Sequence, residues 1–561
     1  MSNTAKQTRE TASALPALPA GHVAFVGTGP GDPDLLTVRA ASLIRQADIV
    51  VAETPRQREL VRAVLGLPSL TVPAADGSDN EVPAPGAPEV VEVGFGPDGH
   101  SLPPSARTKV VVRHAKTGRR VVRLLEGDPF VYAAGPEEAQ GCVKAGLSFE
   151  IVPGVSAALA VPTYAGIPLT TRSAQELAVV SCASSKIDWE WYADDKTLVL
   201  LHALEGIDKI ATCLVEAGRS ADTPVAITCT GTSTEQTTLV STLGEIAAEA
   251  EAAQLCEPAI TVVGEVVAMR EALSWFETKP LFGWRVLVPR TKEQAGSLSE
   301  RLRSYGATPE EVPTISVEPP RNPQQMDKAI RGLVEGRYKW VAFTSANAVR
   351  AVREKFDEYG LDARAFSGLS VAAVGDKTAA TLADWGLRAD LVPTGEQSAR
   401  GMLEDWPAYD EQLDMIDRVF LPRADIATET LAAGLVELGW EVDDVTAYRT
   451  VRAAPPPAPV REAIKSGKFD AVVFTSSSTV RNLVGIAGKP HPSTVIAVIG
   501  PQTAKTAEEH GLRVDAMATE PSAEHLADAL AALGYARRAE QLEAGLPVTK
   551  PSDRRTSARK K

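Results

Sequence analysis

The stretch FTSANAVRAV at residues 343–352 is repeated as FTSSSTVRNL at residues 474–483, and this repeat decides the fold of the second half. Two further pairs of segments occur in the same order: RVLVPR at 285–290 with RVFLPR at 418–423, and VAAVGDKTAATLADWGL at 371–387 with VIAVIGPQTAKTAEEHGL at 495–512. Each copy contains short β-branched strands that lead into helical patterns, which is typical of βαβ units. The repeat therefore predicts two similar α/β lobes, and a cleft between paired lobes commonly binds a ligand.

The chain has 561 residues, which is too many for one hydrophobic core. Its net charge of −14 argues against a general nucleic-acid binder, because phosphate contacts need a basic surface. No apolar run approaches the roughly 18 residues needed to span a bilayer, and the N-terminus lacks the apolar segment of a secretory signal. The five cysteines form no C-x-x-C pair, so neither a metal site nor a disulfide framework is predicted. We therefore expect a cytoplasmic protein with no nucleic-acid or membrane partner.

The first half begins with an expected strand, HVAFVG, followed by the glycine-rich turn GTGPGDP at residues 27–33 and a helical pattern over 35–47. Such a turn places backbone N–H groups near a helix start, which favours an anionic or carboxylate-bearing ligand. The turn matches neither the dinucleotide-binding fingerprint nor the phosphate-binding loop, and by itself it is equally consistent with a tight connection. Later strands and helices predict that this half is also α/β.

Four ordered segments of the first half resemble the uroporphyrinogen-III C-methyltransferase family. They are GTGPGDPDLLTVRAASLIRQADIVV, VVRLLEGDPFVYAAGPEEA, FEIVPGVSAALAVPTYAGIPLTT and REALSWF. The resemblance covers about residues 21–276 and implies two α/β domains with an S-adenosylmethionine pocket between them, in a homodimer. It also implies a set of cofactor-binding residues, which are Pro30, Gly127, Asp128, Val131, Ser156, Ala157 and Gly231.

This half departs from the family at positions that handle the substrate. Glu53, a catalytic candidate, stands where the family has Asp, Phe95 replaces a Lys, and His202 aligns with a cofactor-lining Met. Glu126 replaces a Gly, and YAAGPEE lacks an Arg that could pair with substrate carboxylates. Two interpretations stay open: an active methyltransferase, or a degenerate domain that serves as a scaffold or a tetrapyrrole-binding module.

The second half resembles uroporphyrinogen-III synthase over about residues 283–534. The resemblance rests on WVAFTSANAV, VAAVGDKTAATLADWGL, RVFLPRADIATETLAAGLVELGWEVDDVTAYRTV and FDAVVFTSSSTVRNL. It implies one lobe formed by residues 283–317 and 452–534, and another formed by residues 318–451. The stretch AAPPPAP at 453–459 predicts a stiff extended connector at the second crossing between the lobes.

Four further segments are expected outside the compact units. They are a disordered N-terminus at 1–20, an exposed loop at 73–90, a linker at 277–284 and a basic flexible tail at 535–561.

The second resemblance implies cyclisation of hydroxymethylbilane to uroporphyrinogen III, with inversion of the last pyrrole and without a cofactor. The enzyme must then hold the linear substrate in the geometry that closes the ring. Tyr448 matches the family's cleft Tyr, whose phenol could assist departure of the hydroxyl as an acid; a buried structural Tyr is the alternative. Arg423 and Lys377 could add positive charge. Hydroxyl residues at two helix starts could bind substrate carboxylates, although they equally suit helix capping: Thr344 and Ser345 at one, and Thr475, Ser476 and Ser477 at the other.

The combined prediction is an α/β protein, with a tetrapyrrole-methylase fold followed by a two-lobed synthase fold. It would make uroporphyrinogen III and methylate it to precorrin-2, towards sirohaem and cobalamin, with S-adenosylmethionine as methyl donor, tetrapyrroles as small-molecule partners and no metal. One alternative is a synthase with a degenerate methyltransferase domain. A non-catalytic two-lobed binding protein would fit the repeat but not the combined motifs.

Overall fold

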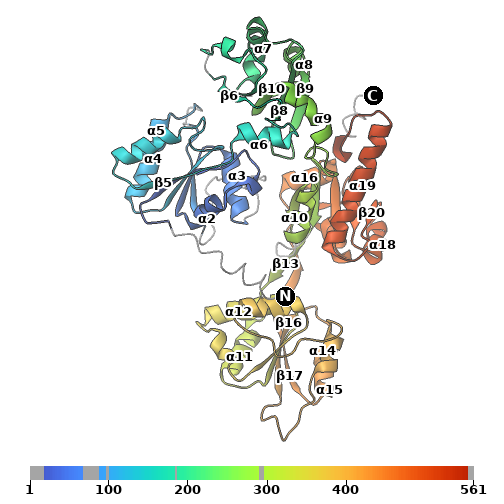
Figure 1. Ribbon diagram of the computed structural model, residues 1–561. Coiled ribbons are helices and arrows are strands. Elements are labelled where there is room, and N and C mark those ends of the chain that lie inside the picture. Colours follow the sequence, from blue (N-terminus) through green and yellow to red (C-terminus); the bar gives the residue numbers. More distant parts are fainter. Residues whose placement is uncertain (1–17, 67–86, 96–99, 184–185, 290–295, 554–561) are drawn as a thin grey trace.

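The computed structural model describes residues 18–66, 87–95, 100–183, 186–289 and 296–553. These residues form four α/β bodies, each built on a five-stranded sheet (Figure 1). We call them the first and second domains of the N-terminal half, and lobe one and lobe two of the C-terminal half. The predicted α/β class is confirmed.

The first domain has a fully parallel sheet in the order β3-β2-β4-β1-β5. Its strands are β1 (Val23–Gly27), β2 (Ile49–Ala52), β3 (Glu89–Glu92), β4 (Val121–Leu125) and β5 (Phe149–Val152). Helices cover both faces, which explains why the central strands are almost continuously apolar. One face packs against α2 (Val38–Gln46) and α3 (Pro55–Val64), and the other against α4 (Pro104–Lys116) and α5 (Gly135–Lys144).

The second domain has a mixed sheet in the order β6-β7-β10-β8-β9. Its strands are β6 (Leu177–Ser181), β7 (Thr197–Leu201), β8 (Pro224–Cys229), β9 (Thr237–Thr242) and β10 (Ala259–Val263). One face packs against α7 (Ile207–Glu216) and α8 (Ile246–Ala252). The other face packs against α6 (Ala157–Tyr164), which follows directly from the carboxyl edge of the first sheet. The start of α6 therefore lies where the two domains meet.

Lobe one has a fully parallel sheet in the order β12-β11-β18-β19-β20. Its strands are β11 (Arg285–Pro289), β12 (Thr308–Val312), β18 (Ala471–Phe474), β19 (Val495–Val498) and β20 (Ala516–Met517). Its helices are α10 (Gly296–Ser304), α16 (Ala458–Ser466), α17 (Ser477–Ala487), α18 (Pro501–Glu509) and α19 (Ala523–Glu543).

Lobe two has the order β13-β17-β16-β14-β15, and β13 is its antiparallel member. Its strands are β13 (Ile315–Glu318), β14 (Trp340–Phe343), β15 (Ser370–Ala373), β16 (Arg418–Ala424) and β17 (Glu441–Arg452). Its helices are α11 (Pro323–Val334), α12 (Ala346–Glu358), α13 (Asp376–Asp384), α14 (Ala399–Asp405) and α15 (Thr430–Glu437).

The chain passes between the lobes through one two-stranded ribbon. In this ribbon Ile315 lies opposite Arg452, and Glu318 lies opposite Arg449. Both crossings expected from the sequence fall inside or at the end of these paired strands. Because β13 pairs with β17, residues 315–317 belong to the sheet of lobe two rather than to lobe one.

Neither lobe corresponds to one copy of the sequence repeat. Strand β11, from RVLVPR, lies beside β18, which ends at the Phe of FTSSS, whereas β16, from RVFLPR, lies beside β14, which ends at the Phe of FTSAN. The repeated segments therefore occur in the same spatial order in both sheets, β11-β18-β19 and β16-β14-β15. Each lobe is assembled from parts of both copies.

The segment 277–284, expected to be a linker, is packed rather than free. Leu281 and Trp284 are buried in the core of lobe one, and the rings of Phe276 and Phe282 are 5.2 Å apart. The tail expected from residue 535 is also partly helical. Helix α19 continues to Glu543 because it lies against this segment, where a Cβ on Gly534 would be 2.4 Å from the Pro280 carbonyl oxygen.

Three other expectations need smaller corrections. Ala458 and Pro459 of the proline-rich connector form the first turn of α16, where proline is tolerated because its missing N–H would have no partner. Residues 73–86 of the expected loop and 1–17 of the expected disordered N-terminus lie outside the described residues. Leu18 is buried, and Glu89 begins β3. Within the described chain, no helix is long and apolar enough to cross a membrane.

Candidate active sites

Three loops at the carboxyl edge of the first sheet meet at glycines. A Cβ on Gly27 would lie 2.5 Å from the Gly127 carbonyl oxygen and 2.6 Å from the Gly154 backbone. A Cβ on Gly154 would lie only 2.0 Å from the same carbonyl oxygen. Gly29 and Gly127 exchange two backbone hydrogen bonds, with N···O distances of 3.2 and 3.0 Å. The glycines of these motifs are therefore required by contact between the loops themselves.

Four of the predicted cofactor residues lie around this contact. The Asp128 carboxylate accepts hydrogen bonds from the backbone N–H groups of Phe130, at 2.8 Å, and Gly154, at 3.0 Å. A Cβ on Gly127 would lie 3.7 Å from both Ser156 Cα and the Ala157 nitrogen. The structure thus brings Gly127 and Asp128 to the start of α6. Val131, in the next turn, is 44% exposed.

The remaining two predicted cofactor residues belong to loops that join the two domains. Asp32, close to Pro30, donates its backbone N–H to Thr232 Oγ1 at 3.3 Å, and its carboxylate accepts a 2.8 Å hydrogen bond from the Tyr164 hydroxyl. Thr232 follows Gly231, whose Cβ would lie 2.5 Å from the Val161 side chain of α6. The sequence did not single out Asp32, Tyr164 or Thr232.

Backbone strain is concentrated where these domains meet. Among the described residues, positive φ angles outside glycine occur at Tyr132, His202, Thr230 and Thr232, and also at Gln254, which follows α8 on the opposite face of the second sheet. Tyr132 donates from its hydroxyl to the Val179 carbonyl across the domain boundary, at 2.6 Å. Such conformations cost about 1–3 kcal/mol each, and their clustering is typical of ligand sites.

Glu53 is part of a buried ion-pair network. Arg123 is fully buried and donates to Glu138 at 2.7 Å and to Glu53 at 2.5 Å, while Arg107 also pairs with Glu53. A buried charge needs such partners because leaving water is costly. The charged Arg123 within the apolar strand VVRLL was the sequence signal for this network.

The same network affects Glu126, which precedes Gly127. Desolvation and, second, the negative charge of Glu53 raise the pKa of Glu126, while Arg56 and His202 oppose that rise. The side chain of Glu126 is nevertheless exposed to solvent.

In the synthase half, the structure brings two predicted residues together. The hydroxyl oxygens of Ser345 and Tyr448 are 2.9 Å apart, although 103 positions separate them in the chain. Ser345 also caps α12 by accepting the backbone N–H of Ala348 at 3.2 Å. Tyr448 is 7% exposed and lies in β17, opposite the end of β16. Ser345 therefore caps α12 and also contacts Tyr448.

The hydroxyl residues of lobe one are more committed to structure. Ser476 forms a capping box with Thr479 at the start of α17. Ser477 donates to the Gln502 carbonyl at 3.0 Å and accepts from Thr506 at 3.0 Å. Half-buried Thr475 lies just before this cap.

Lobe two contains Thr344, which corresponds to Thr475 of lobe one, and the two residues expected to add positive charge, Arg423 and Lys377. Half-buried Thr344 precedes the Ser345 cap. Arg423 pairs with Asp444 and donates to the Thr428 carbonyl at 2.6 Å, so it serves the fold rather than offering an open charge. Lys377 is exposed.

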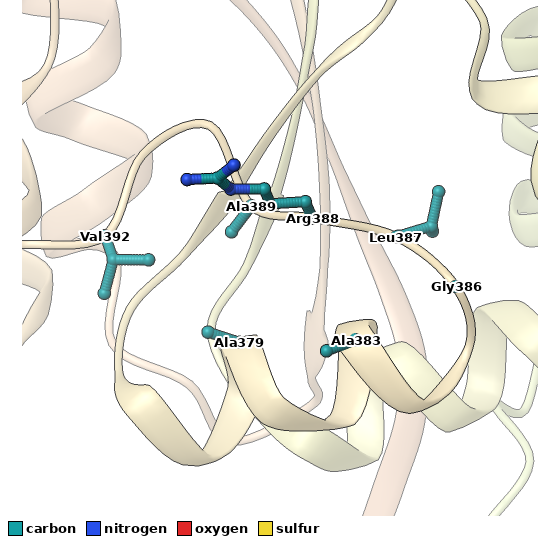
Figure 2. A pocket seen from close by; sticks show the side chains of 7 residues that line it. All are labelled: Ala379, Ala383, Gly386, Leu387, Arg388, Ala389 and Val392. Carbon is teal, nitrogen blue, oxygen red and sulfur yellow. The ribbon is translucent and has the colours of Figure 1, made fainter. Parts of the chain in front are cut away.

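Lobe two also carries a shallow hollow of about 470 Å³ beside α13 (Figure 2). None of the predicted site residues contributes to its wall, which is small and apolar except for one arginine: Ala379, Ala383, Gly386, Leu387, Arg388, Ala389 and Val392. Within the described chain, no group of three or more His, Cys, Asp or Glu residues could hold a metal ion.

Both halves match known families. The model of the tetrapyrrole (corrin/porphyrin) methylases matches residues 22–247, and that of uroporphyrinogen-III synthase HemD matches residues 296–528. The porphyrin biosynthesis protein HemD of Ruminiclostridium josui is 31% identical over 504 residues, covering 88% of this chain and 94% of that protein. The present chain belongs to the same family as that HemD protein. It is an enzyme of tetrapyrrole biosynthesis that joins a methylase to a uroporphyrinogen-III synthase, as predicted.

Other known proteins are similar to only one half of this chain. Siroheme synthase of Acinetobacter baylyi is 38% identical over 263 residues, covering 46% of this chain and 53% of that protein. The native uroporphyrin-III C-methyltransferase of Thermus thermophilus is 30% identical, with a TM-score of 0.34, covering 44% of this chain and 93% of that one. The wild-type uroporphyrinogen III synthase of the same organism is 24% identical, with a TM-score of 0.26, covering 46% of this chain and 99% of that one.

Proposed function

We propose that the second half cyclises hydroxymethylbilane to uroporphyrinogen III and that the first half methylates this product to precorrin-2. The observation that supports the methylation is the convergence of the predicted cofactor residues at the domain interface. Two glycine-rich loops, the start of α6 and the loop containing Gly231 all border that interface. In this proposal the synthase makes the substrate that the methylase consumes.

The residues at the domain interface fit S-adenosylmethionine. The start of α6 at Ser156 and Ala157 can offer backbone N–H groups to a carboxylate. The exposed side chain of Val131 offers apolar surface to an adenine ring, and Pro30 and Gly231 would border the same ligand. When bound, S-adenosylmethionine supplies an electrophilic methyl group, so the protein mainly has to align the donor with a nucleophilic pyrrole carbon.

The two carboxylates near this interface have different proposed roles. Glu53 was a catalytic candidate, but its contacts with Arg107 and Arg123 favour a structural role. Asp128 would order the cofactor loop through its two backbone hydrogen bonds, so that the loop is formed before the ligand binds.

In the synthase half, Tyr448 would donate a proton to the departing hydroxyl of hydroxymethylbilane. The Ser345 hydroxyl would orient the phenol of Tyr448 through their contact. The substrate's carboxylates would bind near the starts of α12 and α17, where the helix dipoles favour anions. Thr344, Thr475 and Ser476 are the proposed side-chain donors there. The Ser345 hydroxyl is used to orient Tyr448, and the Ser477 hydroxyl is already committed.

A single reaction series tests the proposal. The full chain is supplied with hydroxymethylbilane, with and without S-adenosylmethionine, and the products are identified by mass and isomer. We expect precorrin-2 when S-adenosylmethionine is present and uroporphyrinogen III alone when it is absent. Isomer I alone, at the spontaneous rate, would contradict both activities.

A second candidate is a synthase whose methylase half only binds tetrapyrrole. It is favoured by Phe95, which is 62% exposed where the family carries a cation. Uroporphyrinogen III without methylated products, despite cofactor binding, would establish it. The family resemblance also leads us to propose a cytoplasmic homodimer formed through the methylase half, which light scattering of the purified chain would test.

A further inference from the structure

A further cavity lies between the two halves, and none of the predicted site residues lines it. It is a cavity of about 530 Å³ lined by the loop before β9, by residues 270–284, by the end of α19 and by the chain that folds back after it. Its walls are rich in hydroxyl and amide groups. They also carry more basic than acidic side chains: Arg270, Lys279, Arg537, Arg538 and Lys550 against Glu235, Glu277 and Asp553.

Two of the basic groups are available to an anion. In the described part of the chain, neither Lys279 nor Lys550 has a carboxylate within 4 Å of its ammonium nitrogen. Lys279 Nζ instead lies 5.3 Å and 5.1 Å from the ring centroids of Trp275 and Phe276. Desolvation lowers the pKa of Lys279, and the negative charge of Asp32 partly opposes that shift.

Two of the cavity arginines, Arg270 and Arg538, contact Glu277 in different ways. Arg270 pairs with the Glu277 carboxylate at 2.7 Å, whereas Arg538 reaches only the Glu277 carbonyl oxygen, at 3.4 Å. The positive charges come from residues 270–279, from α19 and from the chain that follows α19. This distribution suits a ligand with several separated anionic groups better than a single small ion.

A continuous set of hydrogen bonds connects the cavity to the cofactor loop. Glu277 accepts from Gln236 Nε2 at 2.8 Å. The Gln236 amide oxygen accepts the Thr232 backbone N–H at 2.8 Å, and Thr232 Oγ1 accepts the Asp32 backbone N–H at 3.3 Å. Gln236 and Thr232 are buried, so water cannot readily replace these contacts.

We propose that this junction cavity binds a polycarboxylate, namely the acetate and propionate side chains at one edge of a tetrapyrrole. The identity of the ligand rests on the proposed function, because uroporphyrinogen III would be made in one half and consumed in the other. A small polycarboxylate such as citrate shares the same chemistry and is the alternative source. Bound carboxylates compete with Glu277 for Arg270 and thereby alter the hydrogen bonds that hold the cofactor loop.

The test uses the full chain with two substitutions, Lys279→Gln and Lys550→Gln, in one variant. Its matched control is Lys209→Gln with Lys328→Gln, which removes the same charge from helix positions outside the cavity. Uroporphyrin III, a stable octacarboxylate, is the fluorescent probe, and citrate is the small competitor. We expect the junction variant to lose one uroporphyrin site, or to bind there at least about tenfold more weakly, while the control matches the wild type.

Coupling to the cofactor loop is measured in the same proteins. Uroporphyrin III should change the affinity for S-adenosylhomocysteine by about fivefold or more in the wild type and the control, but not in the junction variant. Unchanged uroporphyrin stoichiometry and coupling in the junction variant would overturn the proposal. Loss of citrate binding alone would overturn the tetrapyrrole assignment. The proposed methylation is tested separately, by product analysis. If the wild type makes no precorrin-2 but binds uroporphyrin III at the junction cavity, only the proposed methylation is refuted.

Discussion

The two proposed active sites are held together by different kinds of contact. In the methylase half, Gly27, Gly127 and Gly154 bring three loops into direct backbone contact, and a buried ion-pair network lies beside them. In the synthase half, two hydroxyl groups on separate elements, Ser345 and Tyr448, meet across 2.9 Å. The glycine contacts of the methylase half leave no space for a side chain. In the synthase half, either hydroxyl oxygen can be removed without creating a clash. Substitutions should therefore unfold the first site but mainly slow the second.

Arg123→Met should have the largest effect. It leaves the fully buried Glu138 and the mostly buried Glu53 without their shared counter-charge, which should cost about 3–5 kcal/mol of unfolding free energy. Denaturant unfolding followed in the methylase half measures this loss, and synthase activity should persist. Arg364→Met, which removes an exposed ion pair, is the control. A loss below about 1 kcal/mol would show that the network is not required.

Gly154→Ala should have the next largest effect. Its Cβ would lie 2.0 Å from the Gly127 carbonyl oxygen, so the loops must separate at a cost of about 3 kcal/mol. Binding of S-adenosylhomocysteine, measured by calorimetry, should be lost together with this stability. Gly206→Ala is a matched control in the same half, because only the far end of Ile210 lies within 4 Å. If Gly154→Ala and Gly206→Ala bind S-adenosylhomocysteine equally well, the methylase site does not depend on close contact between its glycine loops.

Tyr448→Phe should slow the synthase without unfolding it. Removing the phenol oxygen removes the proposed acid, and general acids contribute about 100-fold or more to rate. The unfolding free energy should fall by only about 1 kcal/mol, since one hydrogen bond to Ser345 is lost. Ser345→Ala retains the phenol and should give a smaller decrease in rate. An unchanged rate in the Tyr448 variant would remove its role as an acid.

Glu126→Gln should have the smallest effect, and its sign depends on pH. Desolvation and Glu53 raise the pKa of Glu126, so folding disfavours its ionised form. At pH values below the ordinary pKa of a glutamate, the wild type and the variant should be equally stable. Glu126 of the wild type is then protonated in both the folded and the unfolded state. Above that pKa, the variant should be more stable by only a few tenths of a kcal/mol, because the side chain is exposed. Unfolding between about pH 4 and pH 8 checks this; greater stability of the wild type at high pH would contradict it.

Much of this protein could be predicted from short segments. The strands HVAFVG and VAFTS, the turn GTGPGDP and the capping serines Ser345 and Ser476 have local signals, because propensity and turn geometry act over a few residues. The residues that gather at the first domain interface were predicted instead from the resemblance to the uroporphyrinogen-III C-methyltransferase family. The pairings that fill the sites were not visible, since Asp32 with Thr232 and Ser345 with Tyr448 are 200 and 103 positions apart.

The repeat shows where the sequence by itself stops. It determined that the second half contains two similar α/β lobes, because each copy carries the same alternation of strands and helices. It could not determine from the copies alone that RVLVPR would pair with FTSSS and RVFLPR with FTSAN. Equivalent strands have equivalent local preferences, so only the tertiary structure decides which sheet each one joins. It does so through the ribbon of β13 and β17, which returns the chain to lobe one, and through the apolar surface that each completed sheet buries.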